Sequence, residues 1–192
     1  MRHALLALPF ALLPLHAAQA ANHEHSHAHA HEEHASLDAH EHGVASLNVA
    51  LDGQTLEIQL QSPAMNLVGF EHEAKSDADK AKVAAARQHL EQPQALFALP
   101  IEAKCALQDS ELDSPLFGGH AHDEHEHADE HGHSDIDASY RFACANAEAL
   151  QTLELGSFFG TFPGTEKLEV QLIGPSGQQG AELTPRNSRL SF

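Results

Sequence analysis

The sequence predicts an α+β domain with mainly antiparallel strands, arranged as a sandwich or a partly open barrel with one helical hairpin. Three observations lead to this prediction. Apolar and polar residues alternate on both sides of a turn dipeptide in residues 43–62, a stretch rich in helix formers follows at 76–92, and further alternating segments follow that stretch. A chain of 192 residues is long enough for one domain with a hydrophobic core.

The first predicted element is a β-hairpin over residues 43–62. Its two strands are joined at Asp52-Gly53, a dipeptide typical of a two-residue type I′ turn. This turn would pair Leu51 with Gln54 and place every apolar residue of the hairpin on one face. These apolar residues are Ala45, Leu47, Val49, Leu51, Leu56, Ile58 and Leu60.

The hairpin is followed by a predicted loop or short turn at 63–73 and then by a helix. Ser76 is a plausible N-cap, with Asp79 three residues later as in a capping box. Val83, Ala86 and Leu90 have the spacing of one helix face. Pro93 would end this helix and start a short second one, which Pro100 stops.

The remaining segments predict strands at 101–108, 139–145 and 167–173, a short one at Leu153 and Leu155, and a last edge strand near the C-terminus. Cys105 and Cys144 fall on the inward faces of two of these strands. In an exported chain, two cysteines are expected to form a disulfide, and pairing of the strands would tie a long loop. A shared metal site is the alternative for this pair.

The N-terminus has the pattern of a secretory signal peptide, with Arg2, an apolar run at 4–15 and a small-residue cleavage site at 18–20. An N-terminal membrane anchor is the alternative, although the run is shorter than the roughly twenty residues that span a bilayer. Cleavage would leave an exported chain without stable membrane insertion. The predicted organisation is a signal peptide at 1–20, a disordered tract at 21–42, and a single domain at 43–192 with an inserted loop at 109–137.

Fourteen of the eighteen histidines lie in two tracts that lack an apolar face. The first tract contains His23, His25, His27, His29, His31, His34, His40 and His42. The second contains His120, His122, His125, His127, His131 and His133. Aspartate and glutamate fill many of the gaps in both tracts, and neither tract can offset its ordering entropy by burial.

These tracts predict metal binding. Neutral imidazole is a good ligand for Zn²⁺, Ni²⁺, Co²⁺ and Cu²⁺, and nearby carboxylates add oxygen ligands or hydrogen-bond acceptors. Many similar ligand sets imply moderate affinity, high capacity and low selectivity. Zn²⁺ is our first choice, and the sequence leaves Ni²⁺, Co²⁺ and Cu²⁺ open. The alternative is a solvated polar tail with no metal role.

Two histidines lie outside the tracts in the predicted domain. His72 is considered as an ordered ligand, together with His40 or His42, but a hydrogen-bonded surface histidine is the reading that we favour. His89 is expected to be exposed near a helix C-terminus, where the helix dipole favours it.

Charge and motifs limit the remaining functions. The formal net charge is −18, and loss of residues 1–20 would change it to −19 because only Arg2 is removed. Such a chain is a poor partner for nucleic acid and a good one for cations. No nucleophile motif, phosphate-binding loop or HExxH motif is present, so we expect no enzymatic activity.

The order of several short motifs resembles the ZrgA-like, zinc-responsive periplasmic proteins of Gram-negative bacteria. The motifs are EHGVASLNVALDG, SPAMNLVGFEH, LFALP, a strand cysteine, SPLFG, a His-rich loop, FxxFPG and GQQGAELTPRNSRLSF, and they cover roughly residues 40–192. The resemblance implies a periplasmic zinc-binding protein, expressed when zinc is scarce, that assists zinc acquisition alongside an import system. It carries over to His42, His72, the Cys105–Cys144 pair and the loop of 120–133.

Three functions remain open at this point. The first is capture of Zn²⁺ and its transfer to uptake machinery. The second is a metal buffer or an accessory of efflux and resistance, which the tracts would fit equally well. The third is a protein-interaction module with incidental tails.

Overall fold

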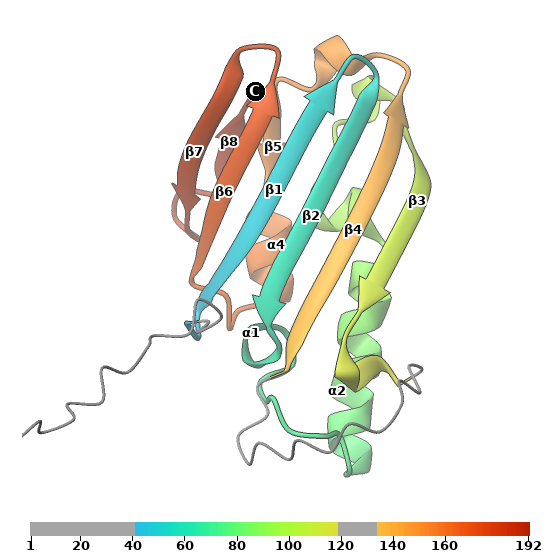
Figure 1. The fold of residues 1–192 in the computed structure, drawn as a ribbon, viewed down its shortest axis with the longest axis vertical. Coiled ribbons are helices and arrows are strands. Elements are labelled where there is room, and N and C mark those ends of the chain that lie inside the picture. The colour runs from blue at the N-terminus through green and yellow to red at the C-terminus, as the bar shows by residue number, and fades with distance from the viewer. Residues whose placement is uncertain (1–40, 119–133) are drawn as a thin grey trace, which may run out of the picture. The chain divides into compact units, whose positions relative to one another are not determined.

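The computed structural model describes residues 41–118 and 134–192, and its largest feature is a six-stranded sheet (Figure 1). In spatial order the strands are β3 (Cys105–Asp113), β4 (Asp135–Cys144), β2 (Thr55–Pro63), β1 (Val44–Asp52), β6 (Lys167–Gly174) and β7 (Gly177–Leu183). Neighbouring strands are antiparallel, except that β1 and β6 are parallel. The sheet is therefore mixed but mainly antiparallel.

One face of this sheet is buried and the other is exposed. In β1, for example, Leu47 and Val49 are buried while Ser46 and Asn48 are exposed. Figure 1 shows that α2 (Asp77–Leu90), α4 (Gly156–Thr161) and the two-stranded sheet of β5 (Thr152–Glu154) and β8 (Arg189–Ser191) lie behind the same face. The predicted α+β class is confirmed, and the described residues form an open sheet, not a closed barrel.

The β1–β2 hairpin forms as predicted, but its turn is one residue later. Asp52 pairs with Thr55 and Leu51 pairs with Leu56, so the two-residue loop is Gly53-Gln54 and not Asp52-Gly53. Gly53 has a φ of +56°, which suits the first central position of a type II′ turn. The pairing shifts by two residues relative to the prediction, and therefore every apolar side chain keeps its face.

The helices follow the sequence closely. Ser76 caps α2, where its Oγ accepts a hydrogen bond from the Asp79 N–H. The short helix α3 (Pro93–Leu96) begins at Pro93, so the predicted helical pair is present. The segment predicted as a loop or short turn contains α1 (Ala64–Val68), which ends at Gly69 in the left-handed conformation.

The strand predicted at 101–108 is only partly correct. Residues 101–103 form the 3₁₀ turn η1 (Ile101–Ala103), and β3 begins at Cys105. Lys104 between them has a φ of +50°, which interrupts extended backbone. Ile101 is consequently 85% exposed and does not lie on an inward face. Two further 3₁₀ turns are η2 (Pro115–Phe117) and η3 (Ala147–Ala149).

Cys105 and Cys144 form a disulfide between directly paired positions of β3 and β4. The two strands extend into the range predicted for the inserted loop, to Asp113 and from Asp135. The disulfide lies at the opposite end of this hairpin from that loop. The domain boundaries themselves stay predictions.

No helix among residues 41–118 and 134–192 combines the length and apolar character needed to cross a membrane.

Candidate functional site

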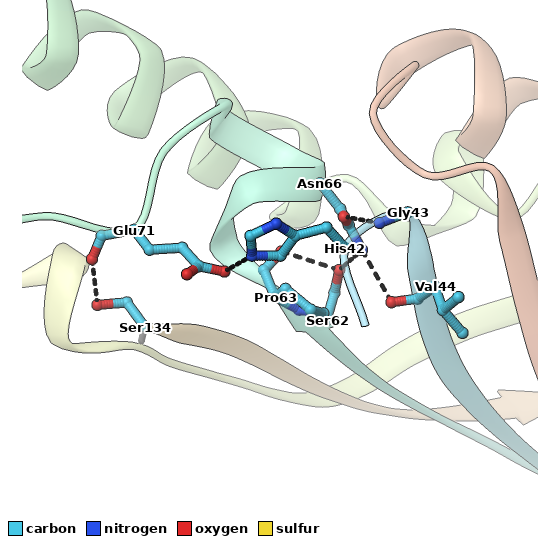
Figure 2. A network of polar contacts seen from close by, with 8 residues as sticks. All are labelled: His42, Gly43, Val44, Ser62, Pro63, Asn66, Glu71 and Ser134. Carbon is cyan, nitrogen blue, oxygen red and sulfur yellow. Dashed lines mark hydrogen bonds and ion pairs between the residues drawn. The ribbon is translucent and has the colours of Figure 1, made fainter. Parts of the chain in front are cut away.

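Both histidine tracts join the described domain at one edge of the sheet, namely the end at which β1 and β4 begin. The first tract ends at His42, two residues before β1 begins, and the second ends at His133, directly before Ser134 and β4. The end of β2 and α1 lie beside these entry points, as Figure 2 shows. The site therefore combines segments that are far apart in the sequence.

Asn66 in α1 holds the entry of the first tract in place. Its side chain accepts a hydrogen bond from the Gly43 N–H at 2.7 Å and donates to the Val44 carbonyl at 2.8 Å and to Ser62 Oγ at 3.2 Å (Figure 2). Asn66 is only 3% exposed, so these bonds satisfy a buried amide. The backbone that follows His42 is fixed by this side chain.

Two glycines make this packing feasible. Gly43 has a φ of +87°, and its carbonyl accepts hydrogen bonds from the Glu166 and Lys167 N–H groups. A Cβ on Gly164 would lie 2.6 Å from the Asn66 carbonyl oxygen, so only glycine allows this close approach. The motifs that contain His42, Asn66 and Gly164 thus meet in space.

Glu71 connects the two entry points. Its Oε1 lies 2.9 Å from Nε2 of His42, and its backbone carbonyl accepts a 2.8 Å hydrogen bond from Ser134 Oγ (Figure 2). The Ser134 carbonyl in turn accepts from the Ala64 N–H at the start of α1. The Glu71 side chain is 10% exposed and the His42 side chain 49% exposed.

This edge of the sheet is also negatively charged. Asp113 and Asp137 are register partners in β3 and β4, and Asp135 begins β4. Burial raises the pKa of Asp137, and the charges of Asp135 and Asp113 raise that pKa further. A cation that approaches the entry points therefore meets a favourable electrostatic environment.

His72 and His89 have ordinary surroundings. His72 is exposed, its Nδ1 lies 3.0 Å from the Glu73 carbonyl oxygen, and its ring stacks on Phe70 with centroids 4.7 Å apart. His89 is exposed near the end of α2 and meets Phe162 edge-on. Both observations agree with the hydrogen-bonded or exposed surface positions that the sequence favoured.

The other tract histidines lie outside the described residues. These are His23, His25, His27, His29, His31, His34, His40, His120, His122, His125, His127, His131 and His133. Among residues 41–118 and 134–192, no three His, Cys, Asp or Glu side chains form a group that could hold a metal ion. His42 and Glu71 supply one imidazole and one carboxylate, whereas Zn²⁺ usually takes four ligands.

Sequence reasoning missed Asn66, Glu71 and Ser134. Glu71 directly precedes His72 in the GFEH motif, and its acidic side chain beside a candidate ligand was the available signal. Asn66 and Ser134 gave no signal in hydrophobic periodicity, because their roles depend on contacts with distant segments.

Comparison with known families gives one match. A family model described as "ZrgA family zinc uptake protein" matches residues 39–192, which include every described residue. No curated protein matches the chain.

Proposed function

This chain belongs to the ZrgA family, and we propose that it is a periplasmic protein that captures Zn²⁺ through its His/Asp/Glu-rich tracts and assists an import system. In this proposal the zinc ligands come from the histidines of 23–42 and 120–133, with Ni²⁺, Co²⁺ and Cu²⁺ as competitors. The protein acts by binding, not by catalysis. The family match supports a role in zinc uptake.

One structural observation carries the proposal further. The entry points of the two tracts are joined through three residues, from His42 to the Glu71 side chain and from the Glu71 carbonyl to Ser134. When two ligand-bearing segments are attached close together, an ion bound by one segment meets the ligands of the other at a high effective concentration. The second tract therefore strengthens zinc binding by the first, even if the two tracts do not contact each other. Tracts attached to distant points would lack this advantage.

His72 is the least supported of the proposed ligands. It lies next to Glu71 in the sequence, but its described contacts are with Phe70 and Glu73. We keep His72 in the proposal as a nearby residue that an ion bound at this edge could recruit.

Growth experiments separate uptake from the other functions. A strain that lacks the gene is grown with a zinc chelator, and it is complemented by the wild-type gene or by variants with asparagine in place of the tract histidines. The proposal expects poor growth of the deletion strain and no rescue when both tracts are altered. The His89→Asn variant is the matched control and should rescue fully.

Other outcomes point to the alternative functions. Normal growth under chelation together with sensitivity to high zinc would contradict uptake and favour a buffer or efflux accessory. Full rescue by a variant without tract histidines would favour a protein-interaction module.

Zinc binding through histidine should depend on pH. Imidazole must be neutral to bind a metal ion, so affinity should fall as pH drops through about 6.5. The many carboxylates in the tracts favour the protonated ring and move this loss to higher pH. Calorimetric titration at several pH values measures the effect, and binding that stayed constant down to pH 5 would mean that carboxylates are the ligands.

A further inference from the structure

We propose that Glu71 is a positioning residue that fixes the tautomer of His42, so that His42 meets a zinc ion with Nδ1. The inference rests on the proposed function, because it assumes that His42 is one of the ligands. It adds a residue that lies outside both tracts, together with a specific chemical task for it.

The tautomer follows from hydrogen-bond chemistry. An ionised carboxylate can only accept hydrogen bonds, so the ring nitrogen 2.9 Å from Glu71 Oε1 must be the donor. That nitrogen is Nε2 of His42. Neutral imidazole carries one N–H, and with the proton on Nε2 the lone pair that binds metal is on Nδ1.

The surroundings of Glu71 favour its contact with His42. The Glu71 side chain is 10% exposed, and a carboxylate with so little solvent contact needs a hydrogen-bond donor. The Glu71 backbone is held separately by the bond from Ser134 Oγ to its carbonyl oxygen. Low solvent exposure and the held backbone therefore restrict the positions that the carboxylate can take beside His42.

The backbone next to His42 is also held by hydrogen bonds. The next residue, Gly43, is bonded through its N–H to Asn66 and through its carbonyl to Glu166 and Lys167. The His42 ring is thus attached next to a hydrogen-bonded backbone and faces the largely buried carboxylate of Glu71. A carboxylate on the second nitrogen of a metal-binding histidine orients the ring and makes it more basic, and its loss typically lowers metal affinity about 10–100-fold.

The first test measures the tautomer in the metal-free chain by ¹⁵N NMR of the histidine rings, with the His42→Asn variant used to assign the His42 signals. We expect the Nε2–H form at His42 in the wild type and a mixture of tautomers in Glu71→Ala. Glu71→Gln keeps an acceptor oxygen and should retain most of the Nε2–H form. Glu73→Ala removes a neighbouring exposed acid and should leave His42 unchanged.

Two results of this test would overturn the proposal. The first is an Nδ1–H tautomer in the wild type, and the second is a His42 tautomer that is the same in Glu71→Ala. Misfolding is not expected to hide the effect, because Ser134 binds the backbone of Glu71 and not its side chain. Glu71→Gln provides a second, milder variant.

The second test follows a zinc titration at the His42 signals. Glu71→Ala should weaken the apparent affinity at His42 by about 10–100-fold, and Glu73→Ala should not change it. If the other tract histidines bind zinc while His42 does not respond, the role of Glu71 is wrong and the proposed function stands. If no histidine responds, the proposed function itself is wrong.

Discussion

At the residue scale, the buried side chain of Asn66 holds the backbone at the entry of the first tract. Its amide group hydrogen-bonds to the Gly43 N–H, to the Val44 carbonyl and to the Ser62 hydroxyl. Loss of this side chain would leave the buried Gly43 N–H without its partner, which costs about 1–3 kcal/mol, and would also open a small cavity.

The Asn66→Ala substitution should therefore lower the free energy of unfolding by about 2–4 kcal/mol. Asn48→Ala is the matched control, because Asn48 lies on the exposed face of β1 and its loss should change stability by less than about 0.5 kcal/mol. Urea unfolding of both variants measures the difference. Equal effects at the two positions would contradict the role assigned to Asn66.

Asp137 provides a second prediction at this scale, and it concerns pH. Burial and the neighbouring Asp135 and Asp113 raise its pKa in the folded state above 3.8. A raised carboxyl pKa favours the folded state below the unfolded pKa, and this contribution is lost as pH rises through the folded pKa. Asp137→Asn should therefore raise the melting temperature at pH 7.

The gain from Asp137→Asn should shrink as pH falls towards 3.8, where the carboxyl becomes protonated in both states. Asp52→Asn, at an exposed strand end, is the control and should show no comparable gain. Thermal unfolding across pH measures both variants. A lower melting temperature of Asp137→Asn at pH 7 would show that the charge of Asp137 stabilises this edge.

At the element scale, Tyr140 joins α2 to the sheet. Its hydroxyl donates a 2.9 Å hydrogen bond to the carbonyl of Leu90, the last residue of α2, and its ring meets Phe97 edge-on. Burial raises the pKa of Tyr140 above its ordinary value of 10.0, so the phenol stays protonated and keeps donating this bond even in alkaline solution.

Tyr140→Phe should lower the free energy of unfolding by about 1 kcal/mol, because the ring stays and only the bond to the helix end is lost. Amide hydrogen exchange should increase in the last turn of α2 more than in β1 or β2. Uniform acceleration across the sheet would show that Tyr140 acts on the whole core and not on the docking of α2.

The elements that the sequence predicted best depend on local patterns. Period-two alternation placed Leu47, Val49 and Ile58 on the buried face, and the Ser76 cap placed the start of α2. The hairpin turn was misplaced by one residue because either Asp52-Gly53 or Gly53-Gln54 keeps these apolar residues on the same face. Periodicity fixes the face of a strand, whereas a pairing shift of two residues leaves the face unchanged.

Features that depend on distant residues were not predictable in this way. The parallel pairing of β1 with β6 joins residues more than a hundred positions apart, and periodicity does not specify a partner. Lys104 adopts the left-handed conformation, which is more typical of glycine and asparagine, so its residue type did not indicate this turn. The Glu71 contact likewise depends on the way in which α1 and the loop after it pass beside β1.

At the scale of the whole molecule, the described part is built on a six-stranded sheet with one buried face. The two histidine tracts are attached at the same edge of this sheet. The disulfide closes the other end of the β3–β4 hairpin, so it stabilises the hairpin at a distance from the tract entry. With a formal net charge of −18, the protein favours cations around it. In the function that we propose, the described part holds the entry points of the two tracts together through the His42–Glu71 and Glu71–Ser134 contacts.

Calorimetric zinc titration tests this account most directly. Three variants carry asparagine at the histidines of 23–40, at those of 120–133, or at both sets, with His89→Asn as the control. The account predicts that each single set weakens binding and that the double set abolishes it, while the control binds like the wild type. A tight zinc site that survives in the double variant would contradict the account, because the described domain would then hold zinc without the tracts.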